Sequence, residues 1–252
     1  SSETTSAGLA DVLLKLGNIP AEYGVTATCR DCDASASTVT FTCCGKLPND
    51  DFKQADPSWA TYPYNTQTKS YTKNIGAVGC ALTAFATVIN YYATTFTDFK
   101  ISTTTPKKLN DTLLNKTNVS GFDPSHNVRF EVVVDTNVSN GKLLLDSKLD
   151  FQLPLTIQNQ EKISKVLHDN LVKSKKTVIA KVYRSWINPK TSKKEEWSHF
   201  VVLVGRCGDR YVISDPGSQV RKLIDPFVPV INDLATQNTF GPIVGLRIVS
   251  EK

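Results

Sequence analysis

The amino-acid sequence predicts an α+β protein in which helices come first and pack against an antiparallel sheet built from the second half of the chain. Two observations support this class. Apolar residues recur at helical spacing in three segments, 80–92, 106–116 and 160–173. Beyond them the pattern changes to short β-branched and apolar runs, at 177–183, 200–204, 211–214, 220–224 and 242–249. Helices followed by a series of strands are typical of α+β folds.

Each of the three predicted helices rests on a local signal. The apolar stripes of the first and third consist of Leu82, Phe85, Ala86 and Ile89, and of Ile163, Val166, Leu167 and Leu171. The second begins with Pro106, a residue that the first turn of a helix tolerates. Residues 54–79 are rich in Tyr, Thr, Asn, Pro and Gly, and we expect them to form loops.

The N-terminal part differs from the rest of the chain. Residues 1–50 hold four of the six cysteines and are predicted to form a segment or small subdomain, whereas residues 51–252 form the main domain. Within the N-terminal part, the spacing of leucines and valine predicts a helix over 6–17. The alternation of Val39, Phe41 and Cys43 predicts a strand over 37–44.

Composition excludes several classes of protein. The 252 residues are 40% hydrophobic and 21% charged, as in ordinary globular proteins. No apolar run is long enough to span a membrane. The net charge of +5 comes from scattered lysines without interleaved aromatic residues, so we expect no nucleic-acid partner. No G-x-x-x-x-G-K-[ST] motif is present, so the sequence contains no ATP-binding motif of this kind. The candidate chemistry described below requires no cofactor, and we expect none.

Cysteines give the only indication of a cellular compartment. Cys29, Cys32, Cys43 and Cys44 form a C-x-x-C pair followed, ten residues later, by two adjacent cysteines. A zinc site is one interpretation, but the adjacent pair lacks the usual gap between ligands. Two disulfides are favoured instead, and they predict an extracellular or cell-surface location.

Cys80 is the candidate nucleophile. It follows Gly79 and opens the first predicted helix, where free backbone N–H groups and the helix dipole favour the thiolate. The preceding glycines permit a tight turn. A buried core cysteine or a disulfide with Cys207 remains the alternative.

His199 and Asp215 are the candidate partners of Cys80. His199 stands before an apolar strand, and Asp215 ends the next strand. Cys207 lies in the connection, eight residues from each. A hairpin that closes symmetrically about Cys207 would place the two residues opposite each other, about 5 Å apart at Cβ. Asp215 would then accept a hydrogen bond from the imidazole and orient it.

Three stretches resemble the bacteriocin-processing (double-glycine) cysteine peptidases, and more closely the stand-alone relatives that lack the transporter. They are QADPSWA from Gln54, the segment from Ile75 through GCALTA to NYY at Tyr92, and HFVVLVG from His199 with YVISDPG from Tyr211. The resemblance covers roughly residues 52–217 and implies a papain-like fold. It also implies Cys80 as nucleophile, His199 as base and then acid, Asp215 as orienting group and Gln54 as oxyanion donor.

These residues predict a cysteine peptidase that cleaves an amide bond through an acyl-enzyme. Its substrate would be a protein or peptide, such as a peptide cross-link of a cell wall. Two alternatives remain. The chain could be a non-catalytic binding or structural module on the same fold, or it could use the same residues as an acyltransferase or amidase.

Overall fold

The structure is a computed structural model of the whole chain. It describes residues 2–4, 10–12, 21–27, 37–43 and 51–252, except for 66–70, 97–100, 116–119, 136–139, 175, 189, 208–209, 220–222, 229 and 234–237.

Two antiparallel pairs form the described N-terminal part. Strand β1 (Ser2–Thr4) pairs with β2 (Ala10–Val12), and β3 (Ala21–Ala27) pairs with β4 (Ser37–Cys43). Strand β4 confirms the strand expected at 37–44. The prediction of a helix over 6–17 is wrong for residues 10–12. These residues form strand β2, because their backbone hydrogen-bonds to β1 instead of within a helix. The predicted disulfides involve Cys29, Cys32 and Cys44, which lie outside the described residues.

All three predicted helices of the main domain are present. Helix α2 (Cys80–Thr95) is longer than expected, and α3 (Pro106–Leu114) is slightly shorter. The third is α5 (Ile157–Leu167), which continues directly into a π-helical turn, η2 (His168–Lys173). The four-residue α1 (Ile75–Val78) and the five-residue α4 (Phe130–Val134) were not predicted, since neither is long enough to show a period.

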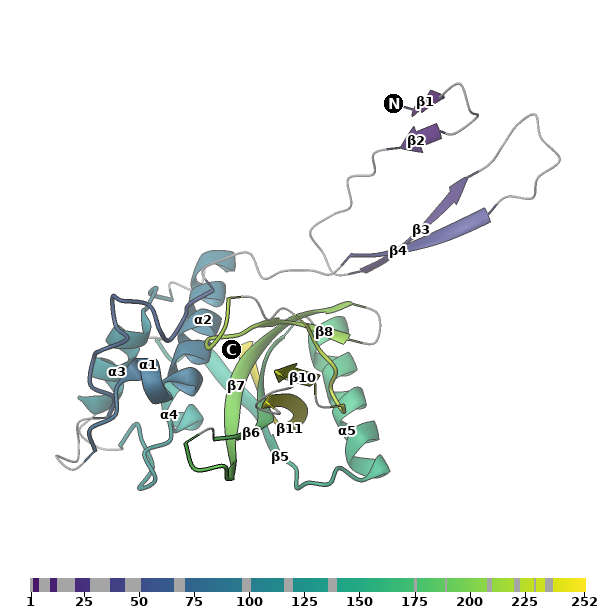
Figure 1. Ribbon diagram of the computed structural model, residues 1–252. Helices are drawn as coiled ribbons and strands as arrows, with labels where there is room; N and C mark the ends of the chain where they lie inside the picture. Colours follow the sequence, from purple (N-terminus) through teal and green to yellow (C-terminus); the bar gives the residue numbers. More distant parts are fainter. Residues whose placement is uncertain are drawn as a thin grey trace.

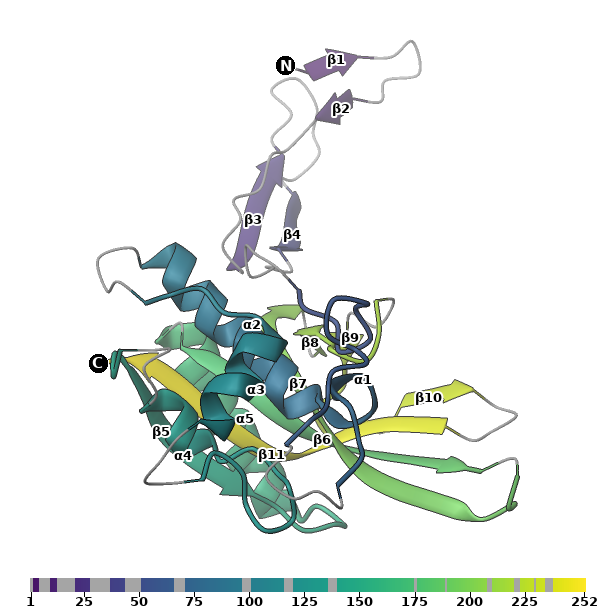
Figure 2. The same ribbon diagram turned by 90° about the vertical axis from the view of Figure 1, so that its left-hand side faces the viewer.

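Among the described residues from 51 onward, all strands belong to one antiparallel sheet of seven strands. Its order is β10 (Val230–Asp233), β11 (Asn238–Glu251), β6 (Thr177–Ile187), β7 (Lys194–Cys207), β8 (Arg210–Ser214) and β9 (Leu223–Ile224), and β5 (Leu143–Asp150) also pairs with β11. Figure 2 shows the long strands β6, β7 and β11 side by side. Four of the five predicted strands are found within this sheet, and of the fifth, 220–224, only Leu223–Ile224 are described, as β9. Strands β5 and β10 were not predicted.

Helices cover both faces of the sheet. On one face, Leu82, Phe85 and Ile89 of α2 share a buried apolar cluster with Ile179 and Val202 of the sheet. On the opposite face, Ile163 and Leu167 of α5 pack with Val178, Val201 and Leu203. Figure 1 shows α1 to α4 on one side of the sheet and α5 on the other. The α+β class, with helices packed against an antiparallel sheet, is therefore confirmed, and the helices lie on both faces of that sheet.

Gly79 separates α1 from α2 and is required by close packing. Its φ of −81° is accessible to any residue. A Cβ at this position, however, would lie 2.5 Å from the carbonyl oxygen of Ile75 and 2.7 Å from Cγ2 of the same residue. The glycine thus lets the short helix α1 pack directly against the start of α2.

We expect Gly79→Ala to lower the free energy of unfolding by about 1–3 kcal/mol, because the added methyl group must displace a backbone carbonyl. Urea denaturation followed by circular dichroism measures this. Ala77→Ser is the matched control, since Ala77 is exposed in the adjacent helix and should change the free energy by less than about 0.5 kcal/mol. Equal stability of wild type and Gly79→Ala would contradict the close-packing account.

Candidate active site

The first residue of α2 is Cys80, as the sequence predicts. Its side chain is partly exposed, and the thiol is free. A disulfide with Cys207 is therefore absent, which removes that alternative. Backbone groups of Ala81, in the first turn of α2, and of Phe200, in β7, hydrogen-bond to the thiol. The cysteine thus lies where a helix N-terminus meets a central strand.

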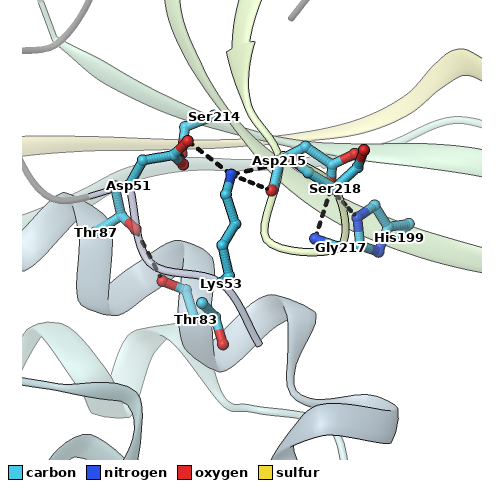
Figure 3. A network of polar contacts seen from close by, with 9 residues as sticks. All are labelled: Asp51, Lys53, Thr83, Thr87, His199, Ser214, Asp215, Gly217 and Ser218. Carbon is cyan, nitrogen blue, oxygen red and sulfur yellow. Dashed lines mark hydrogen bonds and ion pairs between the residues drawn. The ribbon is translucent and has the colours of Figure 1, made fainter. Parts of the chain in front are cut away.

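His199 and Asp215 lie in hydrogen-bond contact. The Nε2 atom of His199 donates to Oδ1 of Asp215 at 2.7 Å, and both residues are buried. The same oxygen accepts the backbone N–H of Gly217 at 2.7 Å, as Figure 3 shows. Because Nε2 is engaged by the carboxylate, Nδ1 is the ring nitrogen left to interact with the Cys80 thiol.

The electrostatics of Cys80 and His199 are coupled. Burial by itself raises the pKa of the Cys80 thiol, but the hydrogen bond and charge of His199, with the two backbone contacts, outweigh burial and lower it below its ordinary value. Burial by itself lowers the pKa of His199, yet the hydrogen bonds to Asp215 and Cys80 raise it to about 9. Both shifts favour a thiolate facing an imidazolium at neutral pH.

The contact between His199 and Asp215 does not arise from the symmetric hairpin that we expected. The last pair of the β7–β8 ladder at this end is Val202 with Ser214. If the pairing continues by one more residue, Asp215 lies opposite Val201, which is two residues from His199. Residues two apart on a strand lie on the same face, and the side chains meet diagonally. The symmetric register was therefore wrong by two residues, although the contact it predicted is present.

A β-bulge sets this register. Between Leu203 and Gly205 the pairing of β7 with β8 shifts by one residue. Without the shift, the pairing of Gly205 with Val212 would continue and place Asp215 against Val202, whose side chain points to the opposite face from His199. The bulge thus turns the carboxylate toward the imidazole.

Gln54 lies beside the loop that leads to Cys80. Its side-chain Nε2 donates to the carbonyl oxygen of Gly76 at 2.8 Å, and its backbone N–H donates to the carbonyl oxygen of Pro216 at 2.9 Å. A carboxamide nitrogen carries two N–H groups, so one remains beyond the bond to Gly76. The buried Oε1 atom has no partner among the described residues. Gln54 therefore contacts the segments that carry Cys80 and Asp215.

The other two histidines are separate from this group. His126 Nδ1 lies 2.9 Å from the side-chain nitrogen of Asn65, and its ring stacks on Tyr71 with centroids 3.9 Å apart. His168 is exposed at the start of η2.

Sequence reasoning missed three residues that surround the group, namely Asp51, Lys53 and Gly217. Lys53 contacts the backbone of the Asp215 turn although 162 residues separate the two positions. No local pattern links residues so far apart. Gly217 had a signal, since it ends the motif Asp215-Pro-Gly, but only the structure shows its N–H on the carboxylate.

The described residues limit what else the chain can hold. They contain no group of three or more His, Cys, Asp or Glu side chains that could bind a metal ion. Within the same residues, no helix has the length and apolar character needed to cross a membrane.

Comparisons with known proteins add little to this geometry. Neither a protein-family model nor a curated protein matches the chain. Among solved structures, one is described as that of a "putative C39-like peptidase from Bacillus anthracis". It is 14% identical, the match covers 80% of this chain and 95% of that one, and the TM-score is 0.36. Because the TM-score is so low, we draw no conclusion about the fold or function of this protein from the likeness.

Proposed function

We propose that the chain is a cysteine peptidase with Cys80 as nucleophile, His199 as general base and acid, and Asp215 as orienting group. The observation that carries the proposal is the Cys80 thiol at the N-terminus of α2, which is electrostatically coupled to the His199 imidazole, whose Nε2 atom lies 2.7 Å from Oδ1 of Asp215. An activated nucleophile, a base within reach and a third group that orients the base are the parts that acyl transfer requires.

The proposed reaction proceeds in two halves. The Cys80 thiolate attacks the carbonyl carbon of an amide, and the carbonyl oxygen becomes an oxyanion. The His199 imidazolium then gives its proton to the leaving amine as the carbon–nitrogen bond breaks, and a thioester remains. Water attacks this thioester with His199 as base, the acid product leaves, and the thiolate returns.

Gln54 is proposed as a donor to the oxyanion, together with the backbone N–H of Cys80. The first N–H groups of a helix have no partner within the helix, so the N–H of Cys80 is suited to this role. The location of Gln54 against Gly76 and Pro216 supports the assignment by bringing its amide to the same corner of the fold.

The substrate class follows from the reaction and not from a described pocket. A peptide or protein amide fits the proposed chemistry, and a cell-wall peptide is one such substrate. An extracellular or cell-surface location stays a prediction from the cysteine pattern. An acyltransferase or amidase would need the same three residues, so substrate profiling must separate these activities.

Alkylation of the thiol tests the proposal directly. We expect iodoacetamide at pH 6 to modify Cys80 at least about tenfold faster than any other cysteine, because an ordinary thiol is almost fully protonated at that pH. Peptide mapping by mass spectrometry identifies the modified residue, and hydrolysis of a peptide library measures the activity that alkylation should abolish. Equal alkylation of all the free cysteines, with no peptide cleaved, would favour the non-catalytic module instead.

A further inference from the structure

Lys53 occupies a junction between two segments that are distant in sequence. Its Nζ atom donates to Asp51 Oδ2 at 2.6 Å, to the carbonyl oxygen of Asp215 at 2.7 Å and to that of Ser218 at 3.1 Å. Three acceptors match the three N–H groups of an ammonium. The side chains of Lys53 and Asp51 are only 15% and 23% exposed. Figure 3 shows the lysine reaching from its own segment to the turn after β8.

Asp51 connects the same two segments through a second contact. Its second carboxylate oxygen, Oδ1, accepts a hydrogen bond from the Ser214 hydroxyl. Ser214 is the last residue of β8 and directly precedes Asp215. The ammonium and the carboxylate therefore hold successive residues of the turn that presents the Asp215 side chain to His199.

The lysine also lies next to Gln54 in the chain. The backbone N–H of Gln54 donates to Pro216, and the carbonyl oxygen of Lys53 accepts the indole N–H of Trp59 at 2.8 Å. The segment of Lys53 and Gln54 thus carries the proposed oxyanion donor and also hydrogen-bonds to the turn that carries the proposed orienting carboxylate. A displacement of this segment would therefore also displace the turn.

We propose that Lys53 is a positioning residue, whose ammonium holds the turn from Asp215 to Ser218 against the segment that carries Gln54. The proposal rests on the proposed function of Cys80, His199 and Asp215. Two carbonyl oxygens and one carboxylate oxygen converge on the Nζ atom, and a neutral apolar side chain would leave all three without this donor. The turn would then change its position, and the hydrogen bond between the Asp215 carboxylate and the His199 imidazole would weaken.

The test is Lys53→Met, which keeps an unbranched side chain only one atom shorter but removes its charge and its three donors. The titratable groups that face His199 are Cys80 from α2 and Asp215 after β8, and both are retained in this variant. We expect kcat to fall by about 10-fold to 100-fold while KM changes less than about twofold, because small misplacements act on the chemical step. The pKa of His199, measured by NMR, should fall by about one unit as its hydrogen bond to Asp215 weakens. The basic limb of the pH–rate profile should move downward with it.

Lys176→Met is the matched control. Lys176 forms an ion pair with Asp146 at 2.8 Å, with side chains 33% and 25% exposed, and it contacts none of the proposed site residues. We expect it to leave kcat and the His199 pKa unchanged. Lys53→Arg, which keeps a cation with several donors, should restore part of the lost kcat.

The outcomes separate the two proposals. A folded Lys53→Met protein with an unchanged His199 pKa overturns the positioning role, whatever its activity, since a lower kcat alone would indicate only a structural role. A wild-type protein that hydrolyses no peptide overturns the proposed function, and the NMR titration still decides whether Lys53 positions Asp215. If Lys53→Met does not fold, the titration is carried out on Asp51→Asn, where a smaller fall of the His199 pKa is expected and no fall overturns the proposal.

Discussion

Replacement of Cys80 by alanine is expected to lower kcat/KM by at least about 10⁴-fold, because it removes the atom that forms the acyl-enzyme. That factor corresponds to about 5.5 kcal/mol of lost transition-state stabilisation. The fold should persist, since alanine is the strongest helix former and Cys80 is the first residue of α2. Steady-state hydrolysis of a peptide identified by library screening measures the loss, and circular dichroism verifies the fold.

Cys207→Ala serves as the control for Cys80→Ala, since both variants remove one thiol. It should retain wild-type activity if Cys80 alone is the nucleophile. Residual activity in Cys80→Ala within tenfold of wild type would overturn the assignment, and loss in Cys207→Ala with full activity in Cys80→Ala would move the nucleophile to the hairpin. Binding of the peptide to Cys80→Ala should survive, because the substituted atom acts on the reaction and not on recognition.

Replacement of His199 by glutamine should lower kcat/KM by about 10³-fold, since a general base contributes about 10²-fold to 10⁴-fold. Glutamine keeps an N–H that can reach Asp215 and so limits the cost of leaving a buried carboxylate unpaired. It also removes the charge that lowers the pKa of Cys80. Alkylation of the thiol at pH 6 should therefore slow toward the rate of an ordinary cysteine.

The pH dependence of the activity is a second test of the role of His199. In the wild type, activity should rise with pH as Cys80 loses its proton, at a pH below the ordinary value for a thiol, and fall as His199 loses its proton near pH 9. The basic limb should vanish in His199→Gln, since no imidazole remains to titrate. His168→Gln, at an exposed histidine, should leave both limbs in place. A basic limb that persists in His199→Gln would assign it to another group.

Sequence patterns predicted most of residues 51–252 because the long elements there are deeply buried and therefore rich in apolar residues. Helix α2 is buried at every position from Ala81 to Asn90, and its largest apolar side chains, Leu82, Phe85 and Ile89, recur at helical spacing. The elements that were not predicted are short or have an ambiguous sequence. Helix α1 has four residues, and β5 begins with three consecutive leucines, which hide in the sequence the regular alternation of its burial. In the N-terminal part, the leucine spacing that favoured a helix coincides with a three-residue strand at β2.

The residues of the candidate site also differ in whether a local sequence pattern could predict them. A cysteine at a helix start is a local feature, and Cys80 opens α2 as expected. His199 was expected at the start of a strand, but it lies within β7, because that strand already begins at Lys194 and pairs with β6 there. The structure nevertheless brings Cys80 and His199 together. The register that places Asp215 beside them depends on a bulge with no sequence signature here. Lys53 depends on a contact between distant segments, which one sequence cannot reveal. Gln54 was reached only through a resemblance, because a loop glutamine carries no chemical signal by itself.

The bulge between Leu203 and Gly205 has a consequence for how related chains should be aligned and classified. Side chains alternate strictly along a strand, so one residue gained or lost at that point would send the carboxylate of Asp215 into the opposite layer while every residue type of the triad stayed in the sequence. A homologue could thus keep the whole motif and have no working site. The placement of a single gap, and not the presence of the motif, would then decide whether a related chain keeps the contact between His199 and Asp215.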